Sequence, residues 1–167
     1  MGIVSSERLR LREFGDGDLD ALAAMVGDRE QMTFYPRPRT RAEAAEWIDR
    51  TRGCYATHGF GPWLIELLPD ARFAGYCGPR PAQVDDVAEI EIGWHVHKDV
   101  WNRGVATEAA TLALAAAVRL GVARVVALVH PDHVGSRRVA ENLGMRAERT
   151  TVLEDDYPAI VYAAALP

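Results

Sequence analysis

The chain has 167 residues, of which 49% are hydrophobic and 8% aromatic, and its formal net charge is −5. This length predicts a single domain over residues 1–167, and no apolar run reaches the roughly 20 residues of a membrane helix. Nucleic-acid binders usually carry a basic face, so the acidic balance argues against that class. We expect a cytoplasmic protein without nucleic-acid or membrane partners.

Alternation and helix caps mark the first elements. Residues 7–13 alternate leucine with arginine, and this period of two predicts a half-buried strand. A short apolar helical stripe then follows two aspartates and ends near Gly27. Thr40 and Glu43 have the spacing of a capping box, so we expect a second helix that stops by the glycine-containing segment 59–62.

The later elements follow from hydrophobic patterns bounded by turn residues. A helix rich in alanine and leucine over about 103–120 ends at Gly121, and Asp132 is the expected cap of a helix near 134–143. We predict further strands at residues 63–68, 72–77, 88–97, 124–130, 146–153 and 157–166, with antiparallel pairing among the first three.

The segment that leads into the helix at 103–120 reads Asp-Val-Trp-Asn-Arg-Gly-Val-Ala-Thr-Glu-Ala over residues 99–109. First-turn amides have no partner within a helix, the helix dipole favours an anion there, and Gly104 and Ala106 leave the backbone open. The segment therefore predicts a pyrophosphate site. It matches neither the three-glycine dinucleotide fingerprint nor the P-loop, which ends in Gly-Lys-Ser/Thr.

Several motifs in a fixed order resemble the Gcn5-related N-acetyltransferase (GNAT) superfamily. Segment 99–109 resembles its acetyl-CoA loop. Trp101, just before Asn-Arg-Gly, resembles the tryptophan of the RimJ/RimL-like branch, which acetylates ribosomal-protein N-termini. The resemblance extends to the Arg-Leu repeat at 8–12, to Glu-Ile-Gly-Trp at 91–94, and to segment 130–145. It therefore covers nearly the whole chain.

The resemblance implies an α/β (α+β) fold with a mixed, mostly antiparallel sheet of six to seven strands and about four flanking helices. One parallel pair, the strands at 88–97 and 124–130, is expected to splay around acetyl-CoA. The implied enzyme moves acetyl to a primary amine, on a protein or peptide N-terminus or a small molecule, by direct attack in a ternary complex. Open alternatives are an antibiotic or amino acid acceptor, or a non-catalytic acyl-CoA-binding module. A homodimer is compatible with this interpretation.

Strand alternation places Glu91 and His95 on one face, opposite Trp94. An amine acceptor arrives mostly protonated, so a base must remove its proton. The resemblance places a catalytic or water-ordering carboxylate in many relatives at the position of Glu91. The alternative is that Glu91 forms a structural ion pair.

The departing thiolate also needs a partner. Many relatives use a tyrosine at the position of Ala140, and the N-terminal-acetylating branch uses a serine instead, which matches Ser136. A hydroxyl is a weak acid, so we assign Ser136 a hydrogen bond to the sulfur rather than proton donation. Ser136 could instead satisfy backbone groups near a helix start. His133 replaces an asparagine that is common in relatives.

The expected acetyl-CoA-binding residues are Trp94, His95, Val96, Asn102, Arg103, Gly104, Val105, Ala106, Thr107, His133, Ser136 and Arg137. The arginines of this group, and Arg138, suit phosphates, although each could be an ordinary surface residue. His95 and His97 lack a third ligand, so we expect no metal. Tyr35, Arg37, Arg39 and Arg41 are acceptor-site candidates, because the resemblance places their loop beside the acceptor.

Overall fold

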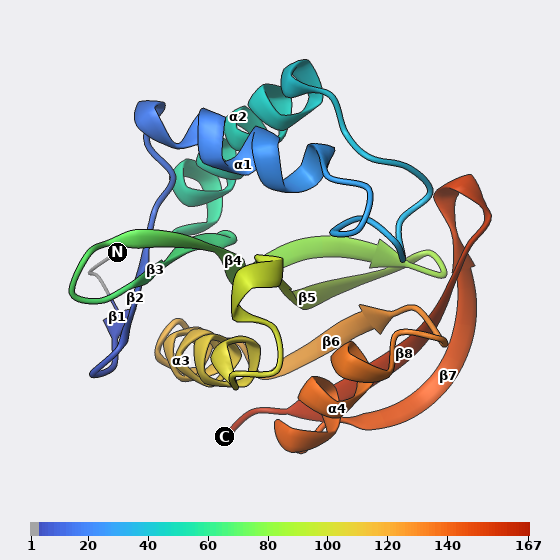
Figure 1. Cartoon of the computed structure of the whole chain (residues 1–167). Helices are drawn as coiled ribbons and strands as arrows, with labels where there is room; N and C mark the ends of the chain where they lie inside the picture. The colour runs from blue at the N-terminus through green and yellow to red at the C-terminus, as the bar shows by residue number, and fades with distance from the viewer. Residues whose placement is uncertain (1–3) are drawn as a thin grey trace.

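The computed structural model describes residues 4–167, which form an eight-stranded sheet in the order β1-β2-β3-β4-β5-β6-β8-β7 (Figure 1). The strands are β1 (Val4–Ser5), β2 (Leu9–Arg12), β3 (Trp63–Leu67), β4 (Arg72–Val84), β5 (Val87–Val96), β6 (Arg124–Val129), β7 (Arg146–Leu153) and β8 (Tyr157–Ala165). β5 and β6 pair in parallel, and the other neighbours pair antiparallel. Within residues 4–167 no helix is long and apolar enough to cross a membrane.

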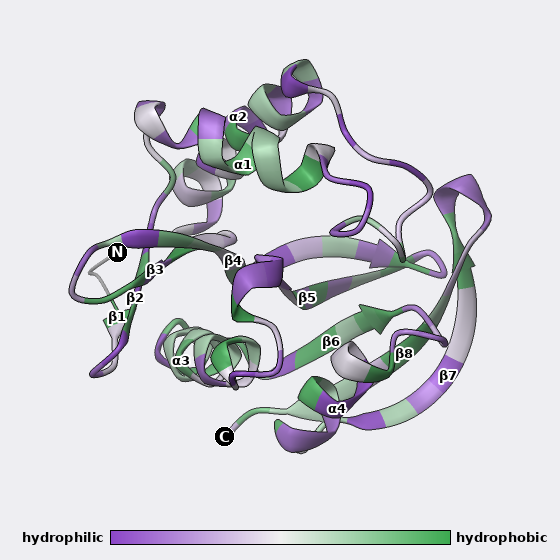
Figure 2. Cartoon of the chain, in the orientation of Figure 1, coloured by the Kyte–Doolittle hydropathy of each residue, from purple (hydrophilic) through white to green (hydrophobic). Residues whose placement is uncertain are grey.

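The helices are α1 (Leu19–Gly27), α2 (Arg41–His58), α3 (Val105–Arg119) and α4 (Val134–Asn142). In Figure 1, α1 and α2 lie over one face of the sheet, and α3 and α4 lie against the other. Strand alternation supplies a core to both layers, because Leu64 packs in the cluster under α1 and α2 whereas Ile65 packs with α3. Figure 2 shows hydrophobic residues along β6 and more hydrophilic residues in the edge strand β7.

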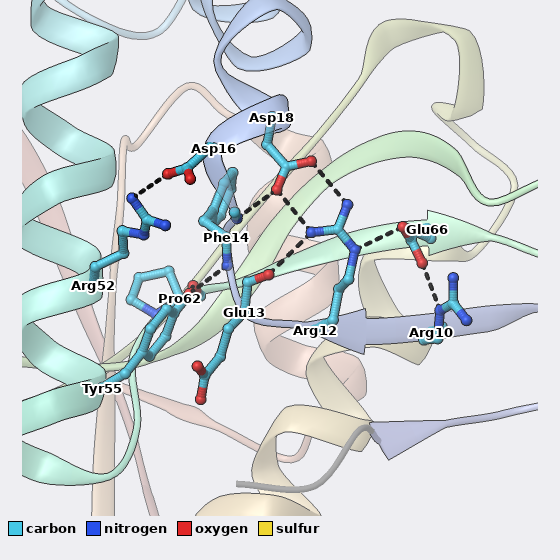
Figure 3. Close-up of polar contacts among 11 residues, drawn as sticks. Arg10, Arg12, Glu13, Phe14, Asp16, Asp18, Arg52, Tyr55, Pro62 and Glu66 are labelled. Carbon is cyan, nitrogen blue, oxygen red and sulfur yellow. Dashed lines mark hydrogen bonds and ion pairs between the residues drawn. The ribbon is translucent and has the colours of Figure 1, made fainter.

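Ion pairs tie the layer of α1 and α2 to the sheet (Figure 3). The Arg12 guanidinium on β2 donates to both oxygens of Asp18, at 2.7 and 2.8 Å, and to Glu66 on β3 at 2.7 Å. Arg10 donates to the other oxygen of Glu66 at 2.5 Å. The hydrogen bonds from Arg12, and a further one from the Gly15 amide, hold the pKa of Asp18 below its ordinary value.

The predicted elements are present, with differences at some boundaries. Thr40 accepts from the Glu43 amide and Glu43 accepts from the Thr40 amide, so the predicted capping box is confirmed. The prediction for β4 was too short, because the strand continues from Cys77 to Val84 through Pro79 and Pro81. These prolines are tolerated because the pairing of β4 with β3 stops at Cys77, and from there on β4 has only β5 as its neighbour within residues 4–167.

Two further predictions need correction. Asp132 was expected to cap α4, but the cap is His133, whose Nδ1 accepts from the Ser136 amide at 3.3 Å. An imidazole nitrogen thus replaces the usual side-chain oxygen at this position. The strand count is eight rather than six to seven, because the two-residue β1 pairs with β2 beyond the predicted first strand.

The parallel strands β5 and β6 are in register at one position, Glu91 opposite Val126, among residues 4–167. Beyond it, β5 continues to Val96 with β4 as its partner, while β6 continues to Val129 with β8 as its partner. The carboxyl ends of β5 and β6 therefore separate, which confirms the predicted splayed pair. The candidate active site lies at this opening.

Candidate active site

The loop before α3 exposes the first amides of that helix. Asn102 and Gly104 have positive φ angles of 58° and 74°, and Gly104 is the N-cap. This bend turns the amides of Val105, Ala106 and Thr107 out of the helix without an intrahelical partner, and all three residues line a cleft. These amides form the positive end of the helix dipole, which suits a phosphate group.

Residues of the turn between β1 and β2 contact this loop and the first turn of α3. Glu108 in the first turn of α3 accepts from the Ser6 hydroxyl and from Arg8 Nε, both at 2.6 Å. Arg8 also donates from Nη2 to the Arg103 carbonyl at 3.1 Å. Sequence reasoning missed this role of Arg8, which the Arg-Leu repeat placed in a predicted strand and which lies just before β2 in the structure. These contacts fix the loop through residues about a hundred positions away.

The cleft has a volume of about 1530 Å³ and lies where β5 and β6 separate. Its walls come from the carboxyl half of β5, the start of α3, the β6–α4 junction and the loop between α1 and α2. It therefore connects the exposed helix amides with the face of the sheet under α1 and α2.

Glu91 on β5 lines the cleft, and the residue is only 7% exposed. Arg80 on β4 donates from Nε to a single oxygen, Oε2, at 2.9 Å, and its Nη2 forms an ion pair with the same oxygen at 2.8 Å. The other oxygen, Oε1, would lie 3.8 Å from a Cβ placed on Gly93. Arg80 therefore orients Glu91 so that Oε1 lies beside the space left by the absent Gly93 side chain.

Ser136 in the first turn of α4 meets β5 across the opening. The Trp94 indole donates to its hydroxyl oxygen at 2.8 Å. This bond occupies a lone pair of Ser136 and leaves the hydroxyl hydrogen available as a donor. Trp94 thus packs on the main core and positions Ser136 at the cleft.

His95 is buried on the same face of β5 as Glu91, with Gly93 between them. Its Nδ1 lies 3.2 Å from the Tyr76 hydroxyl, and its ring stacks on Tyr35 with centroids 5.1 Å apart. Burial lowers the pKa of His95 to about 4. The imidazole is therefore neutral at physiological pH.

The loop between α1 and α2 reaches across the cleft through aromatic contacts. Phe34 stacks on His133 with centroids 4.2 Å apart, and Tyr35 lies 6.4 Å from Tyr157. Gln31 anchors this loop, because its side chain donates to the Val96 carbonyl and accepts from the Lys98 amide, both at 2.8 Å. The loop therefore forms a wall of the cleft opposite α4.

Comparison with known proteins shows which family the chain belongs to. A family model described as an acetyltransferase (GNAT) domain matches residues 8–146. The chain belongs to the GNAT acetyltransferase family. The predicted family and enzyme class, an N-acetyltransferase, are therefore confirmed.

Individual relatives match this GNAT chain over nearly its whole length. It is 29% identical over 159 residues to the uncharacterized protein YkkB of Bacillus subtilis, covering 94% of this chain and 92% of that protein. A GNAT-family acetyltransferase structure from Bordetella pertussis has a TM-score of 0.85 at 23% identity, covering 98% of this chain and 99% of that one. RimL, a ribosomal L7/L12 α-N-protein acetyltransferase solved with coenzyme A, has a TM-score of 0.80 at 18% identity, covering 99% of this chain and 98% of that one. The predicted fold class is confirmed by these likenesses.

Most of the sequence-predicted site residues of this acetyltransferase lie together. Those that line the cleft are Glu91, Trp94, His95, Val96, Asn102, Gly104, Val105, Ala106, Thr107, His133 and Ser136. Arg103 and Arg137 are not among the lining residues; Arg137 donates to the Tyr162 hydroxyl and the Pro131 carbonyl, both at 3.4 Å. Arg138 does line the cleft. The assignment of these residues to acetyl-CoA stays a prediction.

Of the four acceptor-site candidates, two line the cleft and two, outside its lining, form ion pairs. Tyr35 and Arg39 line the cleft, whereas Arg37 pairs with Glu43 and Arg41 pairs with Asp20, each at 2.5 Å. Within residues 4–167, no group of three or more histidine, cysteine, aspartate or glutamate side chains is arranged to hold a metal ion. Residues that sequence reasoning missed, chiefly Tyr76 and Arg80, act through neighbours on the adjacent strand.

Proposed function

We propose that this acetyltransferase moves the acetyl group of acetyl-CoA to a primary amine by direct attack in a ternary complex. The observation that carries the proposal is the continuity of the cleft. It joins the exposed amides at the start of α3 to the oriented carboxylate of Glu91. A phosphate-binding end and a proton-accepting end thus share one opening between β5 and β6.

The residues present fit coenzyme A. The amides of Val105–Thr107 would bind its pyrophosphate, and Gly104 keeps the backbone accessible. Along β5, the His97 amide points to β4 and the Val96 carbonyl to the opposite side. By the same alternation, Trp94 turns its backbone N–H and C=O toward the opening, where they would bind the amides of the pantetheine arm.

Acetyl-CoA supplies a thioester whose carbonyl carbon is open to attack by a neutral amine. Glu91 accepts the proton that the attacking nitrogen must lose, directly or through a water, at Oε1. Arg80 keeps the carboxylate in that orientation through a hydrogen bond from Nε and an ion pair from Nη2, both to Oε2. A carbon–nitrogen bond forms as the carbon–sulfur bond breaks, and the electron pair leaves with the sulfur.

Ser136 assists at the sulfur end of the cleft. Its oxygen is fixed by the Trp94 indole, so its hydroxyl hydrogen is free to donate to the departing thiolate. This hydrogen bond stabilises the negative charge without full proton transfer, because a serine hydroxyl is a much weaker acid than a phenol. Tyr35 and Tyr157 both line the acceptor end of the cleft, with ring centroids 6.4 Å apart.

For the acceptor, we infer the α-amine of a peptide or protein N-terminus. Support comes from the fold shared with RimL, which is described as an α-N-protein acetyltransferase. The cleft also leaves room for small amines, antibiotics and amino acids. Acceptor choice follows from site chemistry rather than from the fold, so a direct comparison of acceptors must decide.

The first test is thiol release from acetyl-CoA with a panel of peptides with varied N-termini, polyamines, aminoglycosides and amino acids. Release that depends on an acceptor, with the acetylated product confirmed by mass spectrometry, is the expected result. Coenzyme A binding by calorimetry without release on any amine would contradict the proposal and favour a non-catalytic acyl-CoA-binding module.

A further inference from the structure

The face of β4 and β5 under α1 and α2 contains a notch. Cross-strand partners on this face are Tyr76 with His95 and Arg80 with Glu91, and Gly93 lies between the two pairs on β5. A Cβ on Gly93 would meet a single atom within 4 Å, Glu91 Oε1 at 3.8 Å. The space above Gly93 is therefore open and is flanked by His95 and Glu91, each about 7 Å away along the strand.

The His95 side of the notch carries an unsatisfied polar atom. The residue is 8% exposed and lines the cleft, and its Nε2 is buried without a hydrogen-bond partner among residues 4–167. Buried polar groups are nearly always paired, and leaving one unpaired is unfavourable. The Gln31 backbone acts on the His95 ring without a hydrogen bond of normal geometry to Nε2, so a group in the cleft can supply that partner.

The contact with Tyr76 indicates whether Nε2 of His95 donates or accepts a hydrogen bond. If the Tyr76 hydroxyl donates to Nδ1, its hydrogen is satisfied and Nε2 carries the imidazole proton. In the opposite tautomer, both the Tyr76 hydroxyl hydrogen and the Nε2 lone pair would lack partners among residues 4–167. The first arrangement leaves fewer unmet groups, so Nε2–H is a donor.

We propose that Nε2–H of His95 donates to an oxygen of the acceptor, so that this enzyme selects amines with a carbonyl or carboxyl oxygen close to the nitrogen. This inference rests on the proposed function and adds a specificity-determining residue to it. An amine above Gly93 faces Glu91 Oε1, and an oxygen two or three bonds further along faces His95. Alkyl amines such as polyamines lack that oxygen.

Tyr35 must move for this contact to form. Its ring stacks on His95, and Tyr35, which is 36% exposed, belongs to the loop between α1 and α2. A side chain on such a loop can change rotamer. The acceptor therefore reaches His95 by displacing the Tyr35 side chain, and the rest of the notch stays in place.

Nitrogen-15 NMR of the imidazoles in the wild-type protein tests the donor directly. The expected result is a neutral His95 with the proton on Nε2, assigned by the signal missing from His95→Phe. Addition of alaninamide to the enzyme with coenzyme A should shift this signal, whereas isopropylamine should not. A proton on Nδ1, or an equal response to both amines, would overturn the inference.

Kinetics test the selectivity. Alaninamide and isopropylamine differ by a carboxamide, and kcat/KM is compared for the unprotonated form of each amine because their pKa values differ. The wild type should prefer alaninamide, and His95→Phe, which keeps a ring beside Tyr35, should reduce that preference about tenfold. His58→Phe, at the exposed end of α2, is the matched control and should keep the wild-type preference.

The outcomes separate the two proposals. Turnover of both amines with an unchanged preference in His95→Phe would overturn the role of His95 and leave the acetyltransferase reaction intact. Thiol release with no amine of any class would overturn the proposed function together with this inference. Calorimetric binding of coenzyme A to His95→Phe shows that the variant is folded.

Discussion

Arg80 and Glu91 face each other across β4 and β5, and two guanidinium nitrogens bind the same carboxylate oxygen at 2.9 and 2.8 Å. An ion pair of this kind can be purely structural. Here it leaves Oε1 beside the open space above Gly93, so the pair orients the carboxylate without blocking it. The structural and functional interpretations of Glu91 are thus compatible.

Replacing Glu91 with glutamine should lower kcat by about a hundredfold or more, because the amide cannot accept the amine proton. Glu89→Gln is the matched control. Glu89 lies on the same face of β5 but pairs with Arg124, outside the cleft lining. The measurement is the pH dependence of kcat for both variants. A Glu91→Gln enzyme with the wild-type rate and pH profile would remove Glu91 as the base.

Replacing Gly104 with valine should weaken coenzyme A binding at least tenfold, about 1.4 kcal/mol. Gly104 has φ +74°, which a β-branched residue disfavours, and the added side chain would meet Arg8 Nη2 at 3.5 Å. Gly121→Val has a comparable φ of +78° with no neighbour within 4 Å, so it controls for backbone strain. Calorimetry should show lost affinity in the first variant alone; retained affinity in Gly104→Val would contradict the phosphate-loop assignment.

Replacing Arg8 with alanine should raise KM for acetyl-CoA about threefold to tenfold and change kcat little. Arg8 contacts the Arg103 carbonyl and Glu108 rather than the reacting groups, so its loss loosens the binding loop only. The effect is modest because the Arg8 side chain is half exposed. Arg10→Ala removes a nearby arginine, on β2, that pairs with Glu66 instead, and it should leave KM unchanged. Equal effects of the two variants would argue against a specific loop contact.

The Arg12–Asp18 pair predicts a loss of stability in acid. The pKa of Asp18 is lowered in the folded protein, chiefly by the Arg12 hydrogen bonds, so its contribution is present above the unfolded pKa, near 3.9, and is lost as pH falls through the folded value. Asp18→Asn should therefore lower the free energy of unfolding at pH 7 by about 1–3 kcal/mol. Urea titrations at several pH values check this. The gap between variant and wild type should shrink below about pH 4; a constant gap would show that the charge is irrelevant.

Local chemistry explains what was predictable from the sequence. The capping box of Thr40 and Glu43 and the bend at Gly104 involve neighbouring residues, so backbone preferences suffice to find them. Alternation and helical spacing located the main strands and helices, and with the family resemblance they predicted the splayed pair. The extension of β4 through two prolines was missed, because proline is acceptable there only once β3 has ended.

The sequence by itself determined the capping box of α2, the order of elements and the loop that leads into α3, because each depends on a few consecutive residues. Only the tertiary structure decided which groups act together. Arg8 meets Glu108, Trp94 meets Ser136 and Tyr76 meets His95 through strand register and layer packing between residues distant along the chain. A shift of one residue in a strand would send these side chains to the opposite face. Such contacts depend on the whole folded chain rather than on any local pattern.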